Sequence, residues 1–218
     1  MPTRLIVFDL DGTLIDSRRD LADAANALIA ELGGAPLNVD AITSMVGEGA
    51  RMLVQRTLTA AQLAVDPDAV LPRFLDLYDE RLLAHTTLYP GTSDALRVLR
   101  EHATLALLTN KPRHHTLRIL AGLAIADWFG EDQVVGGDGP LGRKPDPSGL
   151  RHLMAKADAS AAATTLVGDS AIDLRTARAA GVRVCLVRYG FGFPLAASEL
   201  AGHEAIADRP EDLLRLIE

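Results

Sequence analysis

The sequence predicts an α/β fold: a Rossmann-like parallel β-sheet with helices on both faces, joined to a small all-helical domain. Two observations predict the sheet: short uninterrupted apolar runs end abruptly in polar residues, and segments with helical spacing separate these runs. A third observation predicts the helical domain, because residues 17–88 are far too many for a plain connection. The chain has 218 residues, of which 48% are hydrophobic, so it is long enough to form both parts.

Five apolar runs are predicted to be strands: residues 5–8, 105–108, 134–135, 165–167 and 182–187. Runs without polar alternation indicate strands that are buried on both faces, as in a parallel sheet. Polar residues follow three of them, at Asp9, at Thr109 with Asn110, and at Asp169. Because ligands of such sheets bind beyond the carboxyl ends of the strands, we expect these residues to lie along one edge.

Four segments between the strands have apolar residues at helical spacing: residues 93–100, 117–123, 148–154 and 174–180. Gly181 follows the last of them, as expected for a glycine that ends a helix. His114 and His115 are interpreted as part of a solvated helix start. Strands that alternate with helices are typical of a parallel α/β sheet.

Residues 17–88 are predicted to be an all-helical insert in this core. Apolar residues at helical spacing form two stripes in it, one from residue 21 to 32 and one from residue 70 to 82. The chain returns to the core near the Tyr-Pro-Gly sequence that begins at residue 89. We therefore expect a core made of residues 1–16 and 89–218 and a helical domain made of residues 17–88.

Composition and charge exclude several classes of partner. The formal net charge is −7, and an acidic chain without a basic stripe is not expected to bind nucleic acid or anionic membranes. No segment has the length of a membrane span, and the apolar run at residues 5–8 is too short for a signal peptide. Cys185 is the single cysteine, which is typical of a reducing compartment. The sequence therefore predicts a cytoplasmic globular protein, either a monomer or a homodimer.

Two pairs of carboxylates stand at strand ends. Asp9 and Asp11 follow the first strand, where buried carboxylates are unfavourable unless a cation or hydrogen-bond donors receive them. Hard oxygen ligands suit Mg²⁺, although a turn that caps the strand would also fit this segment. Asp169 and Asp173 form the second pair, where Asp169 or Ser170 could instead cap the following helix.

Two further polar elements complete the set. Thr109 and Asn110 end a strand, where they could simply begin a turn. Lys144 lies in the loop Gly-Arg-Lys-Pro-Asp-Pro, where it could be a solvated cation. Only three of the 22 cationic residues are lysine, so a lysine is more informative in this chain than an arginine. We expect the four polar elements to converge, because one parallel sheet brings its strand ends together.

The chain resembles the haloacid dehalogenase superfamily of phosphotransferases over nearly its whole length. The segments similar to the four motifs of that superfamily, in the same order, are FDLDGTLIDS, LLTNKP, GRKPDP and VGDSAIDLRTARAAG. The helical insert falls where many members carry a cap domain. The resemblance implies that Asp9 is the nucleophile and that Asp11 is the general acid/base. By the same resemblance, Thr109 and Asn110 bind the transferring phosphoryl group, and Lys144 neutralises charge on it.

The resemblance also implies a magnesium ion. Its ligands would be the Asp9 carboxylate, the backbone carbonyl of Asp11 and Asp169, with Asp173 supporting them. A phosphate ester repels a bare carboxylate, so attack by Asp9 requires cations that offset the charge. Mg²⁺ and Lys144 would supply this charge, and the attack would produce an aspartyl phosphate.

Segments outside the four motifs are most similar to bacterial phosphoglycolate phosphatases: MVGEGARMLVQRTL, LYPGT, VVGGDGPLGRKPDP and VRYGFG. This resemblance implies a small phosphorylated metabolite as partner, 2-phosphoglycolate, and a role in carbohydrate metabolism. A sugar-phosphate phosphatase or a phosphosugar mutase of the same superfamily is the alternative among enzymes. A catalytically silent relative that only binds a ligand is the alternative outside enzymes.

Residues 46–51 are the predicted place for substrate recognition in the insert. Gly47 and Gly49 let the backbone approach a ligand, and the N-terminus of a following helix favours an anion. Arg51 is predicted to face the carboxylate of a short phospho-acid. A turn between two helices with a solvated arginine explains the same segment equally well.

Overall fold

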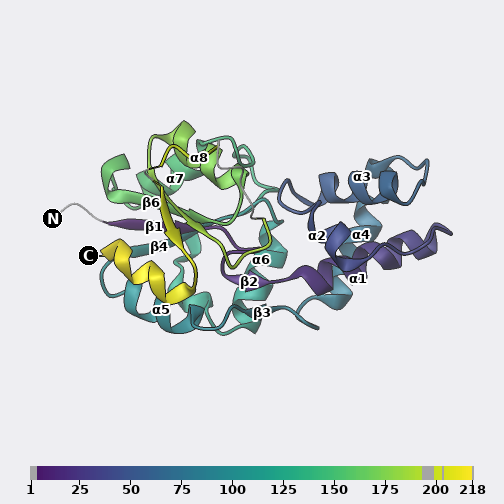
Figure 1. The fold of residues 1–218 in the computed structure, drawn as a ribbon, viewed down its shortest axis with the longest axis horizontal. Coiled ribbons are helices and arrows are strands. Elements are labelled where there is room, and N and C mark those ends of the chain that lie inside the picture. Colours follow the sequence, from purple (N-terminus) through teal and green to yellow (C-terminus); the bar gives the residue numbers. More distant parts are fainter. Residues whose placement is uncertain (1–3, 193–198, 203, 218) are drawn as a thin grey trace.

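The main β-sheet is parallel and lies at the centre of the larger part of the molecule (Figure 1). A computed structural model describes residues 4–192, 199–202 and 204–217. The six strands follow the order β5-β4-β1-β6-β7-β8. Their bounds are β1 Leu5–Phe8, β4 Thr104–Leu108, β5 Val134–Val135, β6 Thr164–Gly168, β7 Arg183–Val187 and β8 Ala205–Ala207. The predicted parallel sheet is confirmed, and β8 is an additional edge strand that the sequence pattern did not indicate.

Strand β1 is central because it carries the chain to the first pair of carboxylates. It pairs in register with β4 and β6, so that Leu5 lies opposite Thr104 on one side and Thr164 on the other. All four of its residues are buried. A strand with paired neighbours and with helices on both faces has no solvated side, which explains its apolar run without alternation.

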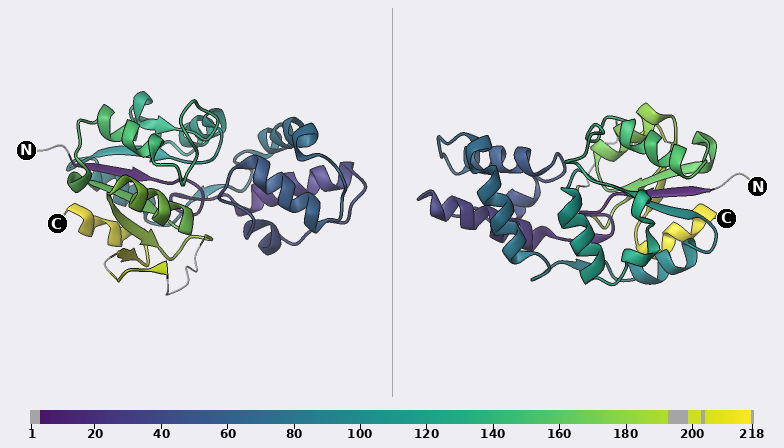
Figure 2. Two further views of the ribbon diagram at one scale, coloured as in Figure 1. Left: turned by 90° about the horizontal axis from the view of Figure 1, so that it is seen from above. Right: turned by 180° about the vertical axis from the view of Figure 1, so that it is seen from behind.

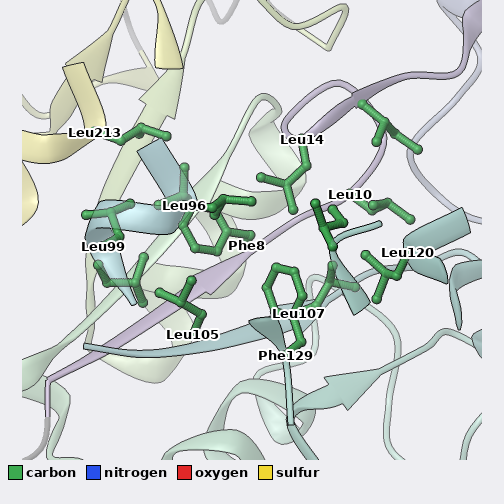
Figure 3. Packing of buried hydrophobic residues seen from close by; sticks show 14 of the residues in the cluster. Phe8, Leu10, Leu14, Leu96, Leu99, Leu105, Leu107, Leu120, Phe129 and Leu213 are labelled. Carbon is green, nitrogen blue, oxygen red and sulfur yellow. The ribbon is translucent and has the colours of Figure 1, made fainter. Parts of the chain in front are cut away.

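Helices cover both faces of the sheet, as predicted. Their bounds are α5 Thr92–Leu99, α6 Arg113–Gly122, α7 Ser148–Lys156 and α8 Ala171–Ala180. Helices α5 and α6 and the 3₁₀ segment η5 (Pro210–Ile217) pack on one face, where Figure 3 shows Phe8 of β1 beside Leu96 of α5. Helices α7 and α8 bury their apolar residues on the other face.

Four helices form a separate group at one end of the molecule (Figures 1 and 2). Their bounds are α1 Arg18–Glu31, α2 Val39–Thr43, α3 Ala50–Ala60 and α4 Pro67–Arg81. The group has its own hydrophobic cluster, whose buried members all lie between residues 21 and 82. The predicted all-helical part of the fold is therefore present, with α1 and α4 packed along each other.

The chain leaves the core and returns to it through two adjacent segments. Strands β2 (Ile15–Asp16) and β3 (Thr87–Leu88) pair antiparallel beneath the helical group. Asp20 in α1 is fully buried, and its carboxylate accepts hydrogen bonds from the main-chain N–H groups of His85 and Thr86, both at 2.9 Å. The Thr86 hydroxyl donates a third bond to it, at 2.6 Å. These bonds hold the base of the helical group next to the loop that follows β1.

The helices of the described residues are short. The longest of them, α4, has 15 residues. None combines the length and the apolar character that crossing a bilayer requires.

Candidate active site

Three of the predicted strand-end residues meet at the carboxyl edge of the sheet. Asp9 follows β1, and its main-chain N–H donates to the carbonyl of Val167 in β6 at 2.9 Å. Asp169 follows β6, and Thr109 follows β4 on the other side of β1. One carboxylate oxygen from each of Asp9, Asp169 and Asp173 lies within 4.8 Å of the others. The sheet topology thus gathers carboxylates that are far apart in the sequence.

Gly12 lets the turn after Asp9 pass close to Asp169. Its φ angle is +83°, in the left-handed region that favours glycine. The turn closes with a hydrogen bond from the Gly12 N–H to the carbonyl of Ile15, at 2.9 Å. A Cβ atom at this position would lie 1.9 Å from Oδ2 of Asp169. Any side chain here would therefore displace that carboxylate.

Lys144 supplies a buried positive charge between two of the carboxylates. Its Nζ lies 2.7 Å from Oδ1 of Asp9 and 2.6 Å from Oδ1 of Asp173, and its side chain is 2% exposed. Burial alone would lower the pKa of Lys144, but the carboxylates of Asp173 and Asp9 outweigh that effect and raise it. The ammonium therefore stays charged, which makes Lys144 an ion-pair partner of Asp9 rather than a solvated loop cation.

Asn110 connects three segments of the site through its side-chain amide. Its Oδ1 accepts from the main-chain N–H of Lys144 at 2.9 Å, and its Nδ2 donates to the carbonyl of Lys144 at 3.0 Å. The same Nδ2 donates to the carbonyl of Gly47, in the loop before α3, at 2.9 Å. The side chain of Asn110 thus fixes the Lys144 backbone, and its predicted contact with a phosphoryl group stays a prediction.

Asp173 both caps a helix and belongs to the carboxylate cluster. Ser170 is the N-cap of α8, and its hydroxyl donates to Oδ2 of Asp173 at 2.6 Å while the Ser170 N–H donates to the same oxygen. The other oxygen, Oδ1, faces Lys144. Helix capping by Ser170 is therefore confirmed, and it is compatible with the predicted role of Asp173 at the site, which stays a prediction.

The electrostatics of the cluster favour a bound cation. In the protein alone, burial raises the pKa of Asp9 to about 6, against the opposing effect of Lys144. Burial, followed by repulsion from Asp173 and Asp9, raises the pKa of Asp169 well above its usual value. Such shifts mean that one ammonium does not balance three buried carboxylates. Their oxygens fit a hard divalent cation, which accepts carboxylate and carbonyl ligands.

Asp11 is held by a residue for which the sequence predicted no role. Lys111 Nζ lies 2.8 Å from both carboxylate oxygens of Asp11, and the Ser17 hydroxyl donates to Oδ1 at 2.5 Å. Burial alone would lower the pKa of Lys111, but the Asp11 carboxylate outweighs it and raises the pKa. Lys111 is one of only three lysines in the chain and directly follows Thr109 and Asn110. Its rarity and its position could have indicated a role at the site.

A pocket opens between this edge of the sheet and the helical group. Asp9, Asp11 and Thr109 lie on its core side. Its apolar lining comprises Leu21, Val46, Leu53, Phe74, Leu75 and Phe191, among other residues. Carboxylates and the buried Lys111 thus face a pocket with an apolar cover, an arrangement in which electrostatic interactions are stronger than in water.

Two further sequence interpretations concern Arg51 and the histidines at the start of α6. The guanidinium of Arg51 pairs with both oxygens of Asp68, at 2.7 and 2.8 Å, and Arg51 is not among the described residues that line the pocket. Its proposed contact with a substrate carboxylate stays a prediction. His114 is exposed as expected, whereas the interpretation of His115 as solvated was wrong. His115 is fully buried because Tyr78 of α4 packs edge-on against its ring.

Comparisons with known proteins agree with this geometry. The sequence model described as "Haloacid dehalogenase-like hydrolase" matches residues 6–187. The chain is 38% identical to a phosphoglycolate phosphatase of Cupriavidus necator over 220 residues, with 100% of this chain and 94% of that protein covered. It is 42% identical to a phosphoglycolate phosphatase of Rhodospirillum rubrum over 196 residues, covering 86% and 80% of the two chains.

A solved structure shows the same fold. The crystal structure titled as a predicted phosphoglycolate phosphatase from Haemophilus somnus superposes with a TM-score of 0.90 at 29% identity, covering 99% of this chain and 98% of that one. The predicted resemblance to phosphatases of this superfamily is thereby confirmed. The protein belongs to the haloacid dehalogenase-like hydrolase family.

Proposed function

We propose that this protein is a Mg²⁺-dependent phosphatase that hydrolyses 2-phosphoglycolate through an aspartyl phosphate on Asp9. The observation that carries the proposal is the ammonium of Lys144 between Asp9 and Asp173, beside Asp169. A phosphatase is also the activity named for the relatives that match almost the whole chain. Their substrate, 2-phosphoglycolate, is the one we propose here.

The metal ligands in this proposal are the carboxylates of Asp9 and Asp169 and the backbone carbonyl of Asp11. Asp173 supports them by orienting Lys144 and Ser170. When bound, Mg²⁺ supplies positive charge that offsets the charge of the phosphoryl oxygens. The raised pKa values of Asp9 and Asp169 support this assignment, because they indicate that these carboxylates lack sufficient positive charge in the protein alone.

In the first half-reaction, a carboxylate oxygen of Asp9 attacks phosphorus and the ester P–O bond breaks. Lys144, 2.7 Å from Asp9, keeps positive charge next to the attacking oxygen. Thr109 is 3% exposed and lines the same pocket, and in this proposal its hydroxyl donates to a phosphoryl oxygen. Asp11, protonated at the start of the cycle, gives its proton to the leaving alkoxide, so that glycolate departs with a neutral hydroxyl group.

In the second half-reaction, Asp11 acts as the base. It takes a proton from a water molecule that attacks the phosphorus of the aspartyl phosphate, and the P–O bond to Asp9 breaks. Inorganic phosphate leaves, and Asp9 is again a free carboxylate while Asp11 is again protonated. Ser17 and Lys111 hold the Asp11 carboxylate in place for both proton transfers.

We further propose that residues 17–88 act as a cap on a core made of residues 1–16 and 89–218. The separate hydrophobic cluster of α1–α4 and the apolar residues that α1, α3 and α4 contribute to the pocket support this division. A carboxylate of the substrate needs a cation in this apolar lining, and Lys111 lines the same pocket.

The proposal is tested by Mg²⁺-dependent release of phosphate from a panel of phosphorylated metabolites, ranked by kcat/KM. We expect 2-phosphoglycolate to rank first and Asp9→Asn to abolish turnover without loss of the folded state. A sugar phosphate ranked first would overturn the proposed substrate. Transfer of the phosphoryl group to a second sugar hydroxyl would indicate a mutase, and no turnover of any ester would indicate a silent ligand-binding relative.

A further inference from the structure

The second anionic group of a substrate has a specific place to bind in the pocket. We propose that the ammonium of Lys111 and the hydroxyl of Tyr78 form a subsite for the carboxylate of a short phospho-acid, on the side of the pocket away from Asp9. The inference deepens the proposed function and rests on it, because it assumes that the phosphoryl group lies at Asp9. It assigns the choice of substrate to a core lysine and a residue of α4.

Lys111 is the cation that such a carboxylate would meet. Among the described residues that line the pocket, it is the one lysine or arginine. Lys144, the other buried lysine, is already placed between Asp9 and Asp173. Arg51 is paired with Asp68 and exposed to solvent. A second negative charge in the pocket therefore finds its closest complement at Lys111.

Lys111 is also fixed in position, as a recognition residue needs to be. Its side chain is 4% exposed, and its main-chain N–H donates to Oγ1 of Thr109 at 3.2 Å. Its Nζ lies 4.8 Å from the centre of the Tyr78 ring as well as 2.8 Å from Asp11. Two protons of the ammonium serve the Asp11 carboxylate, and the third is shared between Tyr78, which lies against the ammonium, and a bound ligand.

Polar atoms without partners lie on the same wall. The hydroxyl of Tyr78 and Nδ1 of His115 are buried and have no hydrogen-bond partner among the described residues, and both residues line the pocket. Buried polar atoms without partners are unfavourable, so a ligand that reaches them gains binding free energy. Burial raises the pKa of Tyr78 to about 12, which keeps its hydroxyl protonated and able to donate to an acceptor.

The spacing along the chain fits a short substrate. Thr109, which faces the phosphoryl position, and Lys111 are separated by one residue in the same loop before α6. Both residues line the same pocket, so the proposal places the phosphate of a compact two-carbon acid at Thr109 and its carboxylate at Lys111. Leu53 and Phe74 close the apolar side of the same pocket, which leaves few polar partners for a larger, hydroxylated ester.

The test compares kcat/KM for 2-phosphoglycolate and for its neutral amide, which has nearly the same shape. We expect the wild type to prefer the acid by about tenfold to a hundredfold, the usual contribution of a charge-assisted hydrogen bond. Lys111→Met is expected to lower turnover of both esters, since Lys111 also holds Asp11, and to bring the ratio close to one. Lys156→Met removes an exposed lysine paired with Asp132 and is the matched control, with an unchanged ratio.

Tyr78→Phe tests the subsite without touching Asp11. Because the hydroxyl has no hydrogen-bond partner, its removal is expected to leave Tm unchanged or higher while the acid-to-amide ratio falls about tenfold. If Lys111→Met does not fold, Tyr78→Phe decides alone. An unchanged ratio in the folded variants overturns the subsite but leaves the proposed function standing. A wild type that hydrolyses an aryl phosphate but not 2-phosphoglycolate overturns the proposed substrate and the subsite with it.

Discussion

Replacing Lys144 by methionine removes the positive charge that the carboxylate cluster depends on. The ammonium lies 2.6 and 2.7 Å from two carboxylates and is almost completely shielded from solvent. Removing one partner of a buried ion pair costs about 3–5 kcal/mol, because the remaining charge is buried without compensation. Because one cation serves both carboxylates, the two contributions are not additive. We therefore expect Lys144→Met to lower the free energy of unfolding by an amount within this range rather than by twice as much.

The same variant tests the electrostatic part of the mechanism. Removal of one preorganised group that stabilises transition-state charge lowers kcat by about 10²–10³-fold, and we expect at least this loss. Lys144→Arg keeps the charge but has a larger, planar group in a space that fits an ammonium. It should therefore lose less stability than Lys144→Met and still be strongly impaired in kcat.

The assay combines urea unfolding without metal and steady-state kinetics with Mg²⁺, each at pH 7.5. Lys156→Met is the control, because its exposed pair with Asp132 should contribute nothing to activity. Repeating the unfolding at pH 5 adds a second check, since protonation of Asp9 should reduce the destabilisation in Lys144→Met. Near-normal kcat in Lys144→Arg would refute the reasoning and make Lys144 a mere loop cation.

Three other predictions concern the metal site and the helical group. Gly12→Ala should weaken Mg²⁺ binding measured by calorimetry, because its Cβ would lie 1.9 Å from an Asp169 oxygen; unchanged affinity would contradict the site. Arg51→Ala should leave kcat/KM unchanged on 2-phosphoglycolate and on an aryl phosphate, since Arg51 pairs with Asp68; a selective loss on the acid would support the sequence-based proposal instead. In the metal-free fold the pKa of Asp9 is about 6, against an ordinary 3.8. Between these two pH values the folded state binds more protons than the unfolded state. The Asp9 carboxylate therefore destabilises the folded state increasingly as the pH rises from 3.8 to about 6. In chelator, Asp9→Asn should therefore gain Tm relative to wild type from pH 4 to pH 7, and a constant difference would contradict that shift.

The sequence predicted that polar residues at strand ends lie together at one edge of the sheet, for a physical reason. A carboxylate such as Asp9 or Asp169 directly after a buried apolar run needs a partner, and a parallel sheet brings such ends together. Lys144 could be included because lysine is rare in this chain and the family resemblance assigns it a role. Its position between two carboxylates depends on the loop conformation and on Asn110, which no local pattern encodes.

The features that the sequence did not predict depend on contacts between distant segments. His115 is buried by Tyr78 from α4, and the spacing of apolar residues on α6 alone does not show this. Lys111 reaches Asp11 across a separation of 100 residues, so its role appears only when β1 and β4 are side by side. Strand β8 is a three-residue edge strand, Ala-Ile-Ala, and is too short to give a detectable pattern.

Trapping of the phosphorylated protein tests the central claim, attack by Asp9, most directly. The variant Asp11→Asn is mixed with an aryl phosphate, whose leaving group needs no proton, so that the first half-reaction proceeds while hydrolysis of the intermediate is slowed. After an acid quench, peptide mass spectrometry should find one phosphoryl group on the peptide that contains Asp9, together with a burst of phenolate equal to the protein concentration. The double variant Asp9→Asn, Asp11→Asn should show neither. A phosphoryl group on another residue, or turnover by the wild type with no burst and no phosphorylated peptide in Asp11→Asn, would contradict the account.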